Sequence, residues 1–236
     1  MTNTKKIKKS FLTSLVITTL ILGSVIGIST ITTDNAYAQA NLNKKVLPPS
    51  AHVYDEFTDK WWQWLTSIPT EQNPANPDTT DCTANQSGNV WFLNGVGALE
   101  DSGGFIERDC AIPTGKQILF PIINLIGSET TSENAESFNE ILTQLLDTAT
   151  DLQVTVDGIP LQNLEQYRFK ESQAFMIDCQ AINLVCLEGE DYAVHEGYFV
   201  MLTPLTPGQH IIEFSGTIDF FGTPFTTGAT YNITVG

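Results

Sequence analysis

Hydrophobic and polar positions divide the chain into three kinds of segment. The first is an apolar run from Phe11 to Ile31, which follows four lysines and precedes the small residues of 36–40 (AYAQA). Positive charge, an apolar stretch and an A-x-A site in this order predict a secretory signal peptide over residues 1–38, cleaved after Ala38. Because the run is longer than most signal sequences, an uncleaved anchor is the alternative.

The second kind of segment has apolar residues at helical spacing. Residues 53–67 place large aromatic and aliphatic side chains on one stripe, and Pro69 follows. Residues 133–148 show the i, i+3, i+4, i+7, i+8 pattern after an acidic first turn. We expect an N-terminal helix at 53–67 and an inserted helix at 133–148. Residues 39–52 are polar with two prolines and predict an arm that precedes the first helix.

The third kind of segment alternates apolar and polar residues, or is a short apolar run, between Gly, Pro and Asn-Gly turns. Short strands at regular spacing are typical of β-sandwiches. We therefore predict a mainly β protein: a single antiparallel β-sandwich domain over 53–236, jelly-roll or Ig-like, with the two helices as additions. The expected strands are 90–93, 105–112, 117–124, 152–156, 167–170, 192–202, 210–214 and 230–235.

The signal peptide changes how the four cysteines are interpreted. In an exported protein an even number of cysteines predicts disulfides. We expect Cys82–Cys110 and Cys179–Cys186, because each pair closes a short local loop, although four cysteines allow three pairings. A zinc site would need closer ligand pairs such as C-x2-C, and the sequence has none.

The chain is strongly acidic. It carries 11 basic and 27 acidic residues, and the leader holds four of the basic residues but only one of the acidic residues, so the mature chain has a net charge of −19. Such a surface repels phosphate backbones and anionic headgroups. We expect no nucleic-acid partner, and membrane contact only through an uncleaved N-terminal segment. Solubility is the simplest role of the charge, and attraction of cations is the alternative.

The sequence WWQW at 61–64 is the most unusual local cluster. Its first and last tryptophans fall in the apolar stripe, whereas Trp62 lies roughly 80–100° away, on the side of Asp55 and Asp59. An exposed Trp beside carboxylates can stack on a sugar ring while the acids bind its hydroxyls. The alternative is packing at a helix–sheet boundary. Trp91, on a strand, is a further candidate contact because neighbouring strand residues face opposite sides.

Acidic residues on loops leave a calcium site open. Asp78, Asp81 and Asp101 are the candidate ligands, since calcium prefers oxygen donors on loops. Solvated surface charge is the alternative, and the EF-hand pattern is absent from the sequence. No other cofactor is expected.

Paired carboxylates would be needed for glycoside hydrolysis. Glu196, beside His195 in an expected strand, and Glu213 are candidates for this role. Carboxylates that converge on a concave sheet face with a basic residue would favour an enzyme. The candidate basic residues are Arg108, Lys116 and Arg168.

Three stretches resemble a family of uncharacterised secreted prokaryotic proteins. They are WWQW…SIP…NP in residues 61–74, C…QSGNVWFL in 82–93 and CAIPTGK…FPI in 110–122. The resemblance implies secretion and a shared fold, and it supplies no catalytic residues. We expect a secreted or cell-surface, non-enzymatic binding or structural domain whose partner is an extracellular glycan or another cell-surface component. A small secreted hydrolase or lyase acting on polysaccharide is the alternative.

Overall fold

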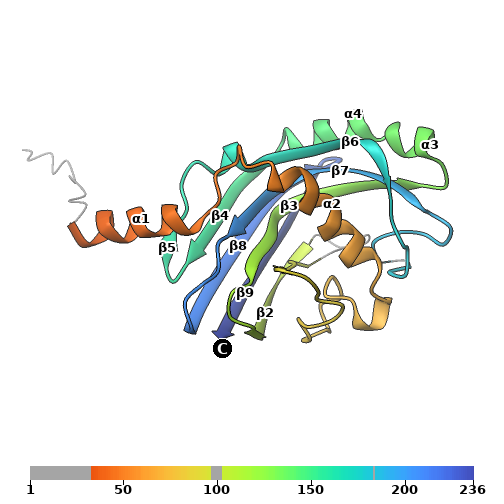
Figure 1. Ribbon diagram of the computed structural model, residues 1–236. Helices are drawn as coiled ribbons and strands as arrows, with labels where there is room; N and C mark the ends of the chain where they lie inside the picture. The colour runs from red at the N-terminus through yellow and green to blue at the C-terminus, as the bar shows by residue number, and fades with distance from the viewer. Residues whose placement is uncertain (1–32, 97–102, 183) are drawn as a thin grey trace, which may run out of the picture.

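The computed structural model describes residues 33–96, 103–182 and 184–236, and shows a mainly β protein with two mixed sheets and a few helices (Figure 1). The helices are α1 (Thr33–Lys45), α2 (Val53–Thr66), α3 (Ser132–Glu136) and α4 (Asn139–Leu146), with 3-10 turns at Thr70–Gln72 and Leu164–Tyr167. The strands are β1 (Val90–Phe92), β2 (Gly103–Ile112), β3 (Gln117–Glu129), β4 (Thr150–Val156), β5 (Ile159–Pro160), β6 (Arg168–Met176), β7 (Tyr192–Leu202), β8 (Gly208–Phe220) and β9 (Thr223–Val235).

The strands form a four-stranded sheet, β1-β3-β7-β6, and a five-stranded sheet, β2-β9-β8-β4-β5. Most neighbours are antiparallel, but β1 pairs in parallel with β3, and β2 pairs in parallel with β9. The prediction of purely antiparallel sheets is therefore corrected to mixed sheets. The first parallel pair arises because β2 joins the second sheet, which leaves β1 and β3 as neighbours.

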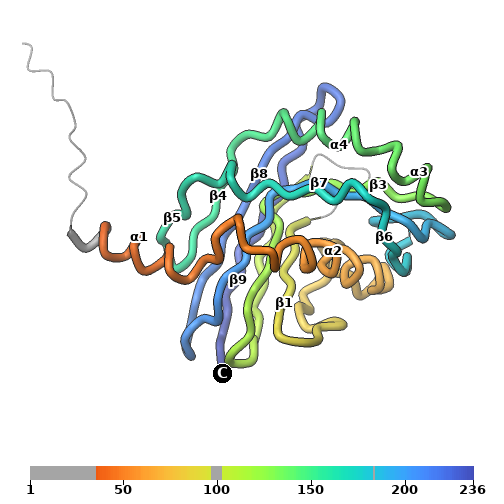
Figure 2. Tube along the Cα trace, turned by 45° about the horizontal axis from the view of Figure 1, so that its top comes forward, coloured from red at the N-terminus to blue at the C-terminus, as the bar shows by residue number. Residues whose placement is uncertain are grey.

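The four-stranded sheet has helices on both faces. His195 of β7 contacts Asp59 of α2 through an Nε2–Oδ1 distance of 2.9 Å, and the next residue, Glu196, accepts a 2.6 Å hydrogen bond from Thr143 of α4. Because consecutive strand residues face opposite sides, α2 and α4 lie on opposite faces of this sheet. Figures 1 and 2 both show α2 on one side of β7 and α4 on the other.

Aromatic packing joins the two sheets and α2. Phe120 of β3 stacks on Phe214 of β8 with ring centroids 4.8 Å apart, and Phe214 also stacks on Tyr231 of β9 at 6.1 Å. Trp61 of α2 packs edge to face against Phe199 of β7. These side chains belong to one hydrophobic core that draws on α2 and both sheets.

The helix expected at 133–148 is interrupted, and α3 and α4 are separated by a turn at Ser137 and Phe138. At the break, Phe138 lies directly over Gly127 of β3, where a Cβ atom on the glycine would collide with its ring. The side chain of Thr131 caps α3 by accepting a hydrogen bond from the backbone N–H of Asn134. Close packing on β3 thus replaces a continuous helix with two short ones.

The arm expected at 39–52 is partly helical and docked, because α1 continues to Lys45 and contains the expected cleavage site after Ala38. Leu42 and Val46 are 2% and 6% exposed, and Val46 forms a β-bridge with Leu202. Two apolar residues four positions apart, in a stretch that is otherwise mostly polar or proline, gave too weak a pattern to predict this contact.

The hydroxyl of Tyr54 connects the segment that follows α1 to β7 through two hydrogen bonds. It donates to the carbonyl of Leu47 at 3.2 Å and accepts from the backbone N–H of Met201 at 3.0 Å. Burial raises the pKa of Tyr54 well above its ordinary value. The neutral phenol is therefore the form that the folded protein stabilises.

We expect Tyr54→Phe to lower the free energy of unfolding by about 1–3 kcal/mol at pH 8, because two buried backbone groups lose their partner. Above about pH 10 the unfolded chain loses the Tyr54 proton and the folded protein keeps it, so wild-type stability falls as pH rises. The Phe variant has no such proton. The difference in free energy of unfolding between wild type and Tyr54→Phe, measured by urea unfolding, should therefore be smaller at pH 10.5 than at pH 8. A difference that is independent of pH would contradict the raised pKa of Tyr54 in the folded protein.

Both expected disulfides are confirmed. Cys82 is bonded to Cys110 and Cys179 to Cys186, with Cα–Cα distances of 6.0 Å and 6.1 Å. Disulfides form and persist in oxidising compartments, so they indicate an extracytoplasmic environment. Within the described residues, no helix is both long and apolar enough to cross a membrane.

Candidate functional site

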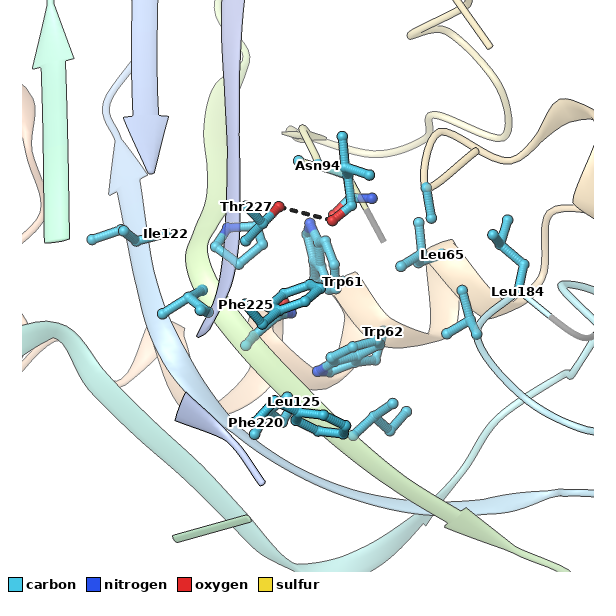
Figure 3. Close-up of a pocket in the computed structure, with 18 residues that line it drawn as sticks. Trp61, Trp62, Leu65, Asn94, Ile122, Leu125, Leu184, Phe220, Phe225 and Thr227 are labelled. Atoms are coloured by element: carbon cyan, nitrogen blue, oxygen red, sulfur yellow. Dashed lines mark hydrogen bonds between the residues drawn. The ribbon is translucent and has the colours of Figure 1, made fainter. Parts of the chain in front are cut away.

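A largely apolar pocket with a volume of about 170 Å³ lies where α2 meets β3 and the β8–β9 hairpin. The helix contributes Trp61, Trp62 and Leu65 to its wall. Residues 121–126 of β3 form another side, and segments 94–96 and 184–185 complete it together with residues of β8 and β9. Figure 3 shows the two tryptophans in this setting.

The shape of the pocket follows from a local irregularity in β3. The pairing of β3 with β7 shifts register between Pro121 and Ile123, which is the signature of a β-bulge. A bulge bends its strand, and a proline fits there because it has no N–H to contribute to the ladder. The bend lies in the stretch of β3 that lines the pocket.

Three hydrogen-bond donors in the wall have no partner among the described residues. They are the indole Nε1 of Trp62 and the amide Nδ2 atoms of Asn94 and Asn124. The other two tryptophans of α2 differ, since the Nε1 of Trp61 and that of Trp64 each donate to a backbone carbonyl at 2.9 Å. Buried polar groups are nearly always hydrogen-bonded, so three unpartnered donors around one pocket are unusual.

Asn94 is held in place by a buried cationic network. Its backbone carbonyl accepts hydrogen bonds from the Nη1 of Arg108 at 3.3 Å and from the hydroxyl of Tyr231 at 2.6 Å, and its N–H donates to the same hydroxyl. Arg108 is only 3% exposed. This network fixes the backbone of Asn94, so the position of its side chain at the pocket is built into the fold.

The structure places the proposed glycan contacts differently from the expectation of an exposed surface. Trp62 is 5% exposed and packs at the helix–sheet boundary, with its ring centroid 6.4 Å from that of His195. Asp59 is paired with His195, whereas Asp55 is exposed. Trp91 is 7% exposed and does not line the pocket. A sugar-stacking face on Trp62 is therefore covered, because Phe175 of β6 and His195 of β7 pack on this side of α2.

The candidate calcium ligands are not gathered into a site in the described part of the chain. Asp78 and Asp81 are exposed, and Asp101 lies outside the described residues. Hydrogen bonds from the side chain and the backbone N–H of Thr83, both 2.7 Å long, hold the pKa of Asp81 below its ordinary value. Among the described residues, no group of three or more His, Cys, Asp or Glu side chains could hold a metal ion. Calcium binding stays a prediction.

The candidate acid Glu196 is engaged in an ion cluster. Its side chain is 4% exposed, and its Oε1 lies 2.5 Å from the Nη2 of Arg168. Burial alone would lower the pKa of Arg168, but hydrogen bonds to Asp147 and Glu196 raise it above its ordinary value. Glu213 is exposed and accepts a hydrogen bond from Thr155. The arrangement of Glu196 suits a structural ion pair between β6, β7 and α4.

Sequence reasoning missed the polar residues of the pocket. Asn94 was part of an Asn-Gly turn signal, and Asn124 stood at the end of an apolar run. The available signal was an asparagine inside the apolar sequence of residues 118–126 (ILFPIINLI), because a buried amide needs a partner. Thr227 was also missed; its hydroxyl donates to the carbonyl of Val96 at 2.8 Å, as drawn in Figure 3.

Comparisons with known proteins add little to this geometry. No protein-family model and no curated protein matches the chain. A solved structure described as PbICP-C in complex with falcipain-2 is similar over 63% of this chain and 100% of its own, with 13% identity and a TM-score of 0.26. The solution structure of Amebosin is similar over 64% and 100%, with 14% identity and a TM-score of 0.22. At these TM-scores neither likeness bears on fold or function.

Proposed function

We propose that this protein is a secreted, non-enzymatic binding protein whose ligand occupies the pocket between α2, β3 and the β8–β9 hairpin. The observation that carries the proposal is the presence of three unpartnered donors in the wall of one apolar pocket. Ligand sites are typically apolar concavities with a few polar groups that fix orientation. An apolar wall favours a ligand of similar character over a glycan, which needs many polar partners.

Secretion is supported by the leader-like sequence of residues 1–38 and by the two disulfides. N-terminal sequencing of the exported protein tests it, with Gln39 as the expected first residue. Cleavage after Ala38 would shorten α1 at its start and would leave the buried residue Leu42 in the mature protein. A mature chain that begins at Met1 would show an uncleaved anchor.

A blocked-pocket variant tests the binding site. Leu184 lines the pocket and is half-buried, so Leu184→Trp should fill the pocket with little strain on the core. Leu187, which directly follows Cys186, is 55% exposed and does not line the pocket, so Leu187→Trp provides the control. We expect small-molecule fragments to bind the wild type and the control at least about tenfold more tightly than Leu184→Trp, which corresponds to about 1.4 kcal/mol.

Ligand-observed NMR with a fragment panel, and a glycan array with and without calcium, provide the measurements. Fragment binding lost only in Leu184→Trp supports the proposal. Fragments that bind all three proteins equally, or no fragment binding at all, would refute it. Glycan binding that Leu184→Trp leaves unchanged would instead move the functional surface away from this pocket.

A further inference from the structure

The geometry points to one ligand class for this pocket: an uncharged, mostly apolar molecule of about one ring in size, whose carbonyl oxygen accepts a hydrogen bond from the indole N–H of Trp62. This inference rests on the proposed function and specifies its ligand. Size, charge and hydrogen-bonding capacity each restrict the class independently.

The volume of the pocket limits the ligand to a small one. About 170 Å³ is of the order of the cavities that hold a single aromatic ring. The wall is mainly aliphatic and aromatic, with side chains such as Leu125, Phe220 and Phe225 (Figure 3). Most of the ligand surface should therefore be apolar, because moving each apolar group from water into the pocket stabilises the complex.

The described wall of the pocket offers nothing to neutralise a charge. None of the described residues that line it is ionisable, and the chain as a whole has a net charge of −16. Burying an ion without a partner is expensive, so carboxylates and ammonium groups are disfavoured. The nearest cationic network, that of Arg108, is directed at backbone carbonyls and Tyr231 and is already saturated with hydrogen bonds.

The three fully buried unpartnered groups of the pocket wall are all donors. An indole N–H can only donate, and in Figure 3 the nitrogen of Trp62 points from α2 toward β3. Among the described residues that line the pocket, no buried side-chain acceptor lacks a partner. A carbonyl meets these donors without bringing a donor of its own. Because the indole N–H of Trp62 is buried, a ligand oxygen reaches it only after a small shift of the lining side chains.

A matched pair of tryptophans makes the inference testable. Trp62 and Trp91 are both buried with an unpartnered Nε1, but only Trp62 lines the pocket. Trp62→Phe removes the pocket N–H, and Trp91→Phe removes an equivalent group elsewhere. The probes are acetophenone, its near-isostere cumene, which lacks the oxygen, and benzoate, which carries a charge.

We expect wild-type protein to bind acetophenone about tenfold more tightly than cumene, as one hydrogen bond to a buried donor would give, and benzoate most weakly. Trp62→Phe should reduce this ratio to about one and Trp91→Phe should leave it unchanged. In ¹⁵N-resolved NMR, acetophenone should move the indole signal that disappears in Trp62→Phe. Equal affinities for acetophenone and cumene, preferred binding of benzoate, or no binding of any probe would overturn the inference. Cumene binding that Leu184→Trp still abolishes would keep the pocket as a binding site.

Discussion

Replacing Arg108 with methionine should lower the free energy of unfolding by about 3–5 kcal/mol, the largest effect that we expect from a single substitution. Its guanidinium donates to the carbonyls of Pro74, Asn76 and Thr79 and to Asn94 and Tyr231 across the interior. Methionine fills similar space but leaves these buried acceptors without a donor. Each unsatisfied group costs about 1–3 kcal/mol.

The buried cation of Arg108 makes no ion pair with the described residues, so its stability in the interior depends on the hydrogen-bond geometry of the guanidinium group. Its charge is balanced by carbonyl dipoles and by the face of Tyr231, whose ring centroid lies 5.9 Å away. Arg108→Lys keeps the charge but loses the planar fork, so we expect an intermediate loss of stability.

Urea unfolding of the three proteins at neutral pH measures this effect. Lys60→Met serves as the control. Lys60 is exposed, and its ammonium group contacts Glu56 and the ring of Phe57 at the surface, so the substitution should change stability by less than about 0.5 kcal/mol. A loss below about 1 kcal/mol for Arg108→Met would show that water satisfies the loop carbonyls and that the network is not structural.

Local patterns predicted the elements that are specified locally. The helix expected at 53–67 is α2, and the strand expected at 192–202 is β7. In both cases large apolar side chains recur at the period of the element, and a turn or proline bounds it. The disulfides were predictable for a similar reason, because each closes a short loop.

Features that depend on distant segments were not predictable. The strand expected at 230–235 extends back to Thr223 in β9, because 223–229 is rich in Thr and Gly and gains its regularity only from pairing along the whole of β8. The parallel pairing of β2 with β9 likewise depends on which sheet β2 joins. No window of sequence around β2 contains that information.

The candidate site illustrates the same limit. The helical wheel correctly placed Trp62 away from the main apolar stripe of α2, yet the residue is buried because Phe175, His195 and Phe199 gather on this face. Amphipathicity identifies the first buried face of a helix, but a second face is buried only when other elements cover it. The pocket exists at this second face, which explains why its polar residues carried no local signal.

Removal of the Cys82–Cys110 disulfide by a double alanine substitution should cost about 3–4 kcal/mol, the second of the two largest expected effects. The bond spans 28 residues, and in the chain-entropy model the loss grows with the length of the closed loop. The Cys179–Cys186 bond spans 7 residues and is the internal comparison, with an expected loss of roughly 2 kcal/mol. Urea unfolding of both double variants under non-reducing conditions measures the difference, and equal losses would contradict the loop-length argument.

The same disulfide should couple to Arg108. Arg108 and Cys110 lie two residues apart on β2 and so face the same side, where both hold the loop of residues 73–82. In Arg108→Met the tethered loop leaves its carbonyls buried and unsatisfied, whereas without the disulfide it can move away and expose them to water. The triple variant should therefore lose at least about 1 kcal/mol less than the sum of the separate losses. Strict additivity would mean that the two contacts stabilise independent parts of the fold.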